Sequence, residues 1–170
     1  YIKIDNTNVD FPVVQTDKEN DKGKKGQYYL RKDFYGNYSM YGTPFLDYRC
    51  DTRPDIQSTN LIVYGHNVYD DGQMFSDLLK YRKLKFYKEH PVIHFDTLYG
   101  DKDWLVVGVV LTNAYEKDGP VWNYNNFIYG TAEETREFVK EVAKRTMVVT
   151  GVDYNENDHF LTLSTCSYDF

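Results

Sequence analysis

The sequence predicts a mainly β fold, a closed or nearly closed β-barrel of about seven strands with two helices. Two observations lead to this prediction. Short apolar runs separated by turn-forming residues recur along the 170 residues, a spacing typical of all-β domains. Aromatic residues make up 17% of the chain, and 17 of them are tyrosines, which suit half-buried sheet surfaces. Closure into a barrel would leave few of these short strands with an exposed edge.

The expected strands follow one another between turns. At residues 2–4 and 159–165 apolar and polar side chains alternate, as in a half-buried strand. The run at residues 104–113 is apolar at nearly every position, so we expect that strand to be buried on both faces. The strands are expected near residues 2–4, 11–15, 43–48, 60–64, 91–96, 104–113 and 159–165.

Two helices are expected between these strands. The first is predicted from apolar residues that share one helical face, namely Met74, Phe75, Leu78 and Leu79. The second is longer and is predicted over residues 131–146, where Thr131 and Glu134 have the spacing of a capping box. Its apolar stripe consists of Phe138, Val139, Val142 and Ala143.

Charge and composition exclude several classes of protein. The formal net charge is −6, and the 20 Lys and Arg residues form no long block, so we expect no nucleic-acid partner. The longest apolar stretch, at residues 104–111, has eight residues, which is less than half of a membrane span. Because the chain starts at Tyr1 and stops at Phe170, inside a strand-like run, we interpret residues 1–170 as a single domain cut from a longer protein.

Cys166 is the first candidate for chemistry. It follows a strand-like run at residues 161–165, and a strand end can hold a sulfur atom at a fixed place. A thiol needs a nearby base or cation to act as a nucleophile, and an inert, buried cysteine is the alternative. We interpret Cys50 as a free thiol without a role, although the sequence also allows a Cys50–Cys166 disulfide.

His66 is the second candidate, because it comes shortly after the strand expected at residues 60–64. Gly65 before it permits an unusual backbone turn, and an imidazole at this place could act as a base, an acid or a charged partner. A histidine that only hydrogen-bonds the backbone of a turn is the alternative. The sequence has no spacing typical of a zinc, calcium or phosphate-loop site, so we expect no metal and no cofactor.

Together the two candidate segments resemble the signature motifs of the sortase family. Tyr-Gly-His-Asn at residues 64–67 resembles the histidine motif, and Thr-Leu-Ser-Thr-Cys at residues 162–166 resembles the cysteine motif. Segments at residues 9–15, 42–47 and 74–78 match as well, so the resemblance covers essentially the whole chain. The helix expected at residues 131–146, between two late strands, indicates a class B sortase.

The resemblance implies a cysteine transpeptidase on the outer face of the membrane of a Gram-positive bacterium. Such an enzyme cleaves a sorting signal near the C-terminus of a secreted surface protein, after its threonine. It then passes the acyl group to an amine of the cell-wall precursor or of another protein such as a pilin. The implied fold is an eight-stranded barrel with an added late helix, preceded by an N-terminal membrane anchor outside this chain. The implied nucleophile is Cys166, and His66 would stabilise its thiolate and protonate the leaving amine.

The resemblance also implies substrate contacts and an arginine. Tyr64, Ser164 and Thr165 neighbour the two candidates and match the family's groove, and ordinary strand packing is the alternative. The family's arginine lies on the strand after the cysteine, whereas all six arginines of this chain precede Cys166. A cationic donor at the oxyanion contributes on the order of several kcal/mol. We therefore expect the final strand and its arginine beyond residue 170, and impaired activity in the 170 residues alone.

Two other functions stay open at this point. One is a catalytically silent, tyrosine-rich barrel that binds peptides or glycans. The other is a papain-like hydrolase, which is disfavoured because the histidine precedes the cysteine in this chain. Faster alkylation of Cys166 than of Cys50, slowed by loss of His66, would favour the transpeptidase over the binding module.

Overall fold

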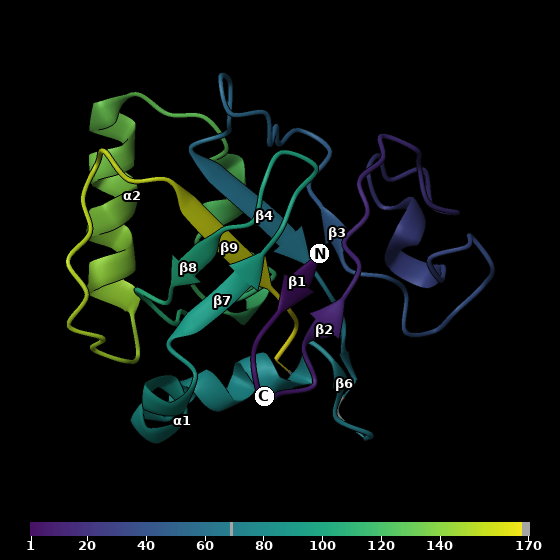
Figure 1. The fold of residues 1–170 in the computed structure, drawn as a ribbon, viewed down its shortest axis with the longest axis horizontal. Helices are drawn as coiled ribbons and strands as arrows, with labels where there is room; N and C mark the ends of the chain where they lie inside the picture. Colours follow the sequence, from purple (N-terminus) through teal and green to yellow (C-terminus); the bar gives the residue numbers. More distant parts are fainter. Residues whose placement is uncertain (69, 168–170) are drawn as a thin grey trace.

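The strands of the protein form three sheets (Figure 1). The structure is a computed structural model and describes residues 1–68 and 70–167. In chain order the strands are β1 (Ile2–Lys3), β2 (Asp10–Phe11), β3 (Phe45–Leu46), β4 (Asn60–Tyr64), β5 (Asn67–Val68), β6 (Gln73–Met74), β7 (Val92–Phe95), β8 (Asp103–Leu105) and β9 (Phe160–Ser164). One sheet has the strand order β2-β1-β7-β8, the second β3-β4-β9 and the third β5-β6.

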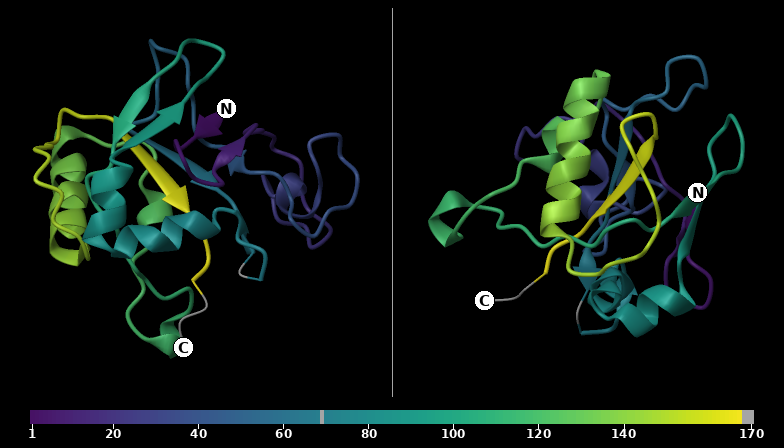
Figure 2. Two further views of the ribbon diagram at one scale, coloured as in Figure 1. Left: turned by 60° about the horizontal axis from the view of Figure 1, so that its bottom comes forward. Right: turned by 90° about the vertical axis from the view of Figure 1, so that its left-hand side faces the viewer.

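Helices lie on two sides of these sheets. The α-helices are α1 (Leu84–Glu89) and α2 (Ala132–Arg145), and the 3₁₀ helices are η1 (Tyr28–Arg31), η2 (Ser76–Arg82), η3 (Glu116–Asp118) and η4 (Tyr124–Asn126). Figure 2 shows α2 on one side of the molecule and the long segment between β2 and β3, which contains η1, on the opposite side. None of the described helices has the length and apolar character that crossing a membrane requires.

The pair of strands β4 and β9 positions the site described below. The two strands are parallel and pair residue by residue, from Asn60 opposite Phe160 to Tyr64 opposite Ser164. Residues 60–63 are buried, as expected for an apolar strand in the middle of a sheet. Both strands were predicted at these places. Because they run parallel and in register, their C-terminal ends lie side by side.

The helix α2 confirms the helix predicted over residues 131–146. The Thr131 hydroxyl accepts a hydrogen bond from the backbone N–H of Glu134, whose carboxylate accepts one from the backbone N–H of Thr131. Phe138 stacks on Phe127 with ring centroids 4.5 Å apart and packs edge-to-face against Phe160 of β9. The apolar face of α2 therefore covers the start of β9.

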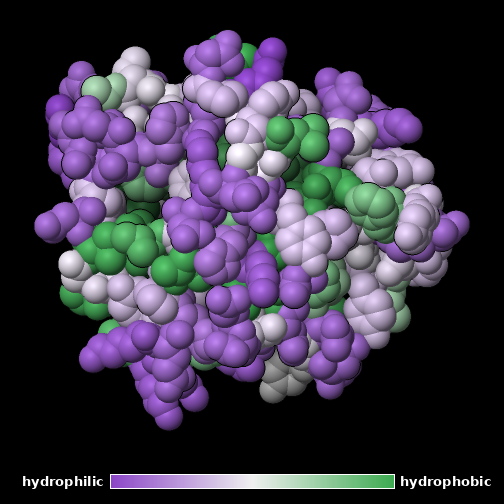
Figure 3. Space-filling model, in the orientation of Figure 1, coloured by the Kyte–Doolittle hydropathy of each residue, from purple (hydrophilic) through white to green (hydrophobic). Residues whose placement is uncertain are grey.

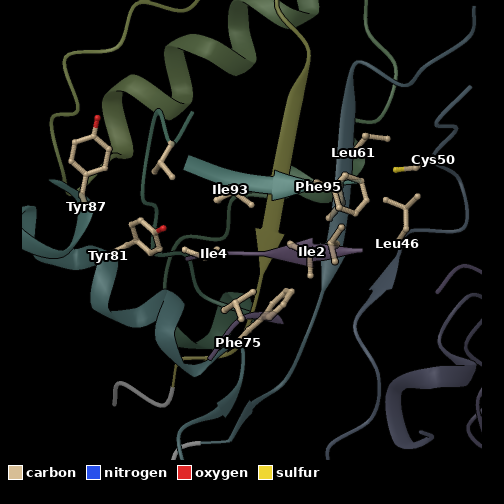
Figure 4. Close-up of a cluster of buried hydrophobic side chains, with 14 of the residues drawn as sticks. Ile2, Ile4, Leu46, Cys50, Leu61, Phe75, Tyr81, Tyr87, Ile93 and Phe95 are labelled. Carbon is tan, nitrogen blue, oxygen red and sulfur yellow. The ribbon is translucent and has the colours of Figure 1, made fainter. Parts of the chain in front are cut away.

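A hydrophobic core lies between the sheets and the η2–α1 segment (Figure 4). Ile2, Leu61 and Phe75 come from different elements and are each at most 1% exposed. Burial of a large apolar side chain contributes about 1.5–3 kcal/mol. Phe75 also lies directly against Gly65 after the end of β4, so the core fixes that turn as well.

Residues 104–113 do not form the strand that the sequence predicts. The strand β8 ends at Leu105, and Val106 is the one buried residue of the run. The Val109 N–H donates to Thr146 Oγ1, and the Val109 carbonyl accepts from the Met147 N–H. Since these backbone groups bond to the segment after α2 rather than to a neighbouring strand, the prediction of a strand buried on both faces is wrong.

The first predicted helix differs in its start and its type. Met74, assigned to the helical face, lies in β6 with a positive φ of 59°. The helix begins at Ser76 as the 3₁₀ helix η2 and is followed by α1. Met74 and Phe75 are buried as expected. However, they precede the helix: Met74 ends β6, and Phe75 lies between β6 and η2.

The mainly β architecture with a few helices is as predicted, whereas the closed barrel is not confirmed. Among the described residues, β8 pairs with β7 and β9 pairs with β4, and both are edge strands of separate sheets. The face in Figure 3 is mostly hydrophilic, with smaller hydrophobic patches between polar side chains.

Candidate functional site

The two segments that carry the candidate residues are hydrogen-bonded to each other beyond the ends of β4 and β9. The Gly65 N–H donates to the Ser164 carbonyl at 3.0 Å, and Thr165 Oγ1 donates to the Gly65 carbonyl at 2.8 Å. These bonds join segments about 100 residues apart in the chain. His66 and Cys166 are the next residues of the two segments, so the parallel register brings them to matching positions at one end of the sheet.

The two cysteines are both free, so no disulfide joins them. Cys166 is exposed after β9. Cys50 is 6% exposed, and its thiol donates to the Asn60 carbonyl at 3.6 Å. Burial raises the pKa of the Cys50 thiol to about 11, because the interior disfavours the charged thiolate. Cys50 is therefore a free, buried thiol whose thiolate is disfavoured at neutral pH.

The imidazole of His66 is half-buried and oriented by a backbone carbonyl. Its Nε2 lies 2.8 Å from the carbonyl oxygen of Leu30 in η1. A carbonyl oxygen only accepts, so Nε2 carries the hydrogen and Nδ1 is the nitrogen left to take up a proton. Burial lowers the pKa of His66, the bond to Leu30 opposes this, and the charge of Arg31 lowers the pKa further.

Gly65 has a different role from the one predicted. Its φ is not among the positive φ values of the described glycines, so no unusual turn conformation is present. Instead, a Cβ at this position would lie 2.6 Å from Cδ2 of Phe75. The Phe75 N–H also donates to the His66 carbonyl at 2.8 Å. Glycine is needed here because the chain passes directly over the Phe75 ring.

The segments after β4 and β9 line a groove with a volume of about 1860 Å³. Its volume exceeds the 300–1,000 Å³ or so of a typical small-molecule pocket. The predicted site residues that line it are Tyr64, His66, Ser164, Thr165 and Cys166.

The polar groups of the three predicted substrate contacts already have partners. Thr165 Oγ1 bonds to Gly65 as described, and Ser164 Oγ lies 2.6 Å from the Tyr124 hydroxyl. The Tyr64 hydroxyl donates to Asp47 Oδ2 at 3.1 Å. These side chains can therefore offer a substrate their apolar surface and the neighbouring backbone more readily than their hydroxyl groups.

Sequence reasoning missed the residues behind Tyr64 and Ser164. Asp47 is 6% exposed and forms an ion pair of 2.7 Å with Arg49, which also donates to the Asn125 carbonyl. Burial alone would raise the pKa of Asp47, but the hydrogen bonds from Arg49 lower it overall. Burial raises the pKa of the Tyr124 hydroxyl. The one signal of this network in the sequence is a charged residue next to a short apolar strand, namely Asp47 directly after β3.

No cation site accompanies the groove in the part of the chain that the structure describes. Within residues 1–68 and 70–167, no group of three or more His, Cys, Asp or Glu side chains is placed to hold a metal ion. Most of the arginines have partners elsewhere, such as Arg53 with Asp51 and Arg136 with Glu156.

Comparison with known proteins identifies relatives of the whole chain. No protein-family model matches it. Sortase B of Staphylococcus aureus is 31% identical over 166 residues, which are 98% of this chain and 62% of the relative. The chain thus spans just under two thirds of the length of this curated relative.

Solved structures of sortase B share the fold. A crystal structure of Staphylococcus aureus sortase B has a TM-score of 0.82 at 30% identity and covers 99% of this chain and 73% of that one. The Staphylococcus aureus sortase B–substrate complex also has a TM-score of 0.82, at 29% identity, and covers 99% and 71%. The sequence identity and the coverage both point to sortase B, and so do the two motifs at the ends of β4 and β9. This chain belongs to the sortase B family.

Proposed function

We propose that this chain is the catalytic part of a cysteine transpeptidase. The enzyme cleaves the C-terminal sorting signal of a secreted protein after its threonine, through a thioacyl intermediate on Cys166. It then transfers the protein to an amine of the cell-wall precursor or of a pilin. One observation supports this best. His66 and the exposed Cys166 each follow one of two paired parallel strands, and both line the same groove. Water in place of the amine would give cysteine endopeptidase activity.

The first half-reaction requires a thiolate and a proton acceptor. Burial lowers the pKa of His66, so the imidazole is neutral at neutral pH and its Nδ1 can accept the proton of Cys166 Sγ. The sulfur bonds to the threonyl carbonyl carbon, and the π electrons of the carbonyl move to its oxygen. When the carbonyl reforms, the C–N bond breaks and Nδ1 gives its proton to the leaving amine.

The second half-reaction reverses these steps with a new amine. The amine nitrogen bonds to the thioester carbon and gives a proton to Nδ1 of His66. The carbon–sulfur bond then breaks, and Sγ of Cys166 recovers the proton. Because the thioester keeps the acyl group activated, the new amide forms without a nucleotide or another cofactor.

The substrate contacts of the proposal are Tyr64, Ser164 and Thr165. All three line the groove, as Cys166 does. A relative with the same fold, Staphylococcus aureus sortase B, has been solved as a complex with its substrate. The exposed faces of these side chains would contact the residues of a sorting signal, for which Asn-Pro-x-Thr-Asn is the pattern that the class suggests. The cation for the oxyanion is not assigned to any of the six arginines present.

Barrel closure and location at the cell surface belong to the same proposal. Among the described residues β8 and β9 each have one partner strand, and both line the groove. One further strand between them would close the sheets and remove both edges. Since the proposed acceptor is a cell-wall amine, the enzyme acts on the outer face of the membrane, held there by an N-terminal anchor.

The test is a mass-spectrometric search for the acyl enzyme. The full-length protein is mixed with a library of sorting-signal peptides, and we expect one peptide class to leave a threonyl adduct on Cys166. Iodoacetamide labelling of the same protein should modify Cys166 far faster than Cys50. No adduct from any peptide, together with equal labelling of both thiols, would contradict the proposal and favour a binding module.

A further inference from the structure

The Cys166 backbone is held by a side chain rather than by the sheet. The ladder between β4 and β9 ends with the bond from Gly65 N–H to the Ser164 carbonyl. Two residues further along both segments, Asn67 Nδ2 donates to the Cys166 carbonyl at 2.9 Å. Within residues 1–68 and 70–167, this is the hydrogen bond that the Cys166 backbone makes. The Asn67 amide therefore replaces the ladder at the position of the thiol.

Asn67 is itself fixed in place. It is 4% exposed and lies in β5, where it pairs with Met74 of β6. The residues beside it are held as well, because the His66 carbonyl accepts from the Phe75 N–H and the Val68 N–H donates to Ser76 Oγ. A side chain on so rigid a support can define the place of the group that it binds.

The second polar atom of the Asn67 amide carries a cost. Its Oδ1 is buried and has no hydrogen-bond partner among the described residues. A buried polar atom without a hydrogen bond destabilises the folded state. Stability alone would favour an apolar side chain at this position, so the asparagine points to a role for its Nδ2 bond beyond packing.

We propose that Asn67 is a positioning residue that sets the geometry between His66 and Cys166. Its backbone directly follows His66, and its side chain binds the carbonyl of Cys166, so one residue connects both reacting groups. This inference rests on the proposed function, in which these two groups exchange a proton. Without the amide, Thr165 Oγ1 still binds Gly65, but the Cys166 carbonyl is no longer held. A misplacement of about 1 Å can cost on the order of 100-fold in rate.

The experiment measures the iodoacetamide alkylation rate of Cys166 in the full-length protein, which needs no knowledge of the peptide substrate. The variants are Asn67→Ala, the isosteric Asn67→Asp, which replaces the donor by an acceptor at neutral pH, His66→Ala and the double variant His66→Ala/Asn67→Ala. We expect each Asn67 variant to lose about tenfold or more of the rate. In the double variant, the loss should be no greater than that of His66→Ala alone, because Asn67 acts through His66.

The matched control is Asn60→Ala. Asn60 is also buried, and its Nδ2 also donates to a backbone carbonyl at 2.9 Å, that of Phe127. All rates are corrected for the folded fraction from urea unfolding, and the exposed Asn8→Ala, which loses a similar bond to Gly72, replaces the control if Asn60→Ala does not fold. The control should keep the Cys166 rate within about twofold.

Three results would overturn the inference. They are an Asn67→Asp rate within twofold of the parent, a control that slows as much as Asn67→Ala, and a double variant in which the two losses multiply. Failure of the proposed function has a different signature. In that case His66→Ala leaves the alkylation rate of Cys166 unchanged and no peptide acylates the parent protein.

Discussion

Cys50 and Cys166 each follow a strand of the β3-β4-β9 sheet, yet their surroundings are opposite. Cys50 belongs to the hydrophobic core, with its thiol directed at the Asn60 carbonyl. Cys166 lies exposed beyond the end of β9 and lines the groove, as His66 does. Burial disfavours the thiolate of Cys50, whereas Cys166 is exposed.

The difference comes from the direction in which the chain leaves the sheet. After β3, the Cys50 N–H donates to the Asp47 carbonyl, and this turn directs the chain back over the core. After β9, Thr165 and Asn67 hold the chain against the end of β4, so Cys166 continues the line of the strand. A cysteine's chemistry is thus decided by the few bonds that follow its strand.

The largest expected effect separates the two thiols directly. Cys166→Ala should abolish formation of the thioacyl adduct, a loss of at least about 1,000-fold, because the bond-forming atom is gone. Cys50→Ala should keep the adduct and lose only about 1 kcal/mol of unfolding free energy through a small cavity. Mass spectrometry of the adduct and urea unfolding measure the two quantities. A Cys166→Ala variant that still forms the adduct would show that Cys166 is not the nucleophile.

The next effect tests the imidazole beside Cys166. His66→Ala should lower the acylation rate by about 10²–10⁴-fold, the usual contribution of a positioned acid–base group. Because burial lowers the pKa of His66, the loss of activity toward acid should have its midpoint below pH 6.5. His159→Ala is the control, since that ring also bonds a backbone carbonyl, that of Ser58. Equal losses in the two variants would show that His66 has no special role.

Much of the fold could be predicted because local patterns and tertiary structure agree there. The apolar run of β4, the alternation of β9 and the capping box of α2 each produced the predicted element. The run at residues 104–113 failed because its apolar side chains indicate burial but do not show where its backbone hydrogen bonds are made. Those bonds lead to Thr146 and Met147, which only the three-dimensional structure reveals.

Residues for the candidate site could be proposed from the sequence, but the contacts that hold them could not. Residue type and the two motifs were enough to single out His66 and Cys166. The carbonyl of Leu30 that fixes the imidazole tautomer comes from a segment with no pattern of its own. Such a contact is a single hydrogen bond between residues far apart in the chain. Composition and periodicity therefore cannot predict it.

A smaller effect probes the buried thiol through pH. Burial raises the pKa of Cys50 from its usual 9.0 to about 11. Between these values the unfolded chain loses the proton while the folded chain keeps it, so stability is full below pH 9 and falls as pH rises toward 11. The two pKa units correspond to about 3 kcal/mol. Urea unfolding at pH 8 and pH 11 should show this extra loss in the parent protein and not in Cys50→Ala.

The smallest effect concerns the turn that brings His66 to Cys166. Gly65→Ala places a Cβ 2.6 Å from Cδ2 of Phe75, and overpacking of this kind costs about 1–3 kcal/mol. Gly108→Ala is a matched control, because its Cβ would lie 2.7 Å from Cγ1 of Val142, under α2. Both variants should lose similar unfolding free energy.

Only the first of these two variants should also change the reactivity of the thiol. Relief of the clash at Phe75 moves Gly65, whose carbonyl and N–H bind the strand end at Thr165 and Ser164. The iodoacetamide rate of Cys166 should therefore fall in Gly65→Ala and stay at the parent value in Gly108→Ala. If both variants unfold alike and both keep the parent rate, the turn at Gly65 does not determine the approach of the two groups, and their alignment must come from the side-chain bond of Asn67 alone.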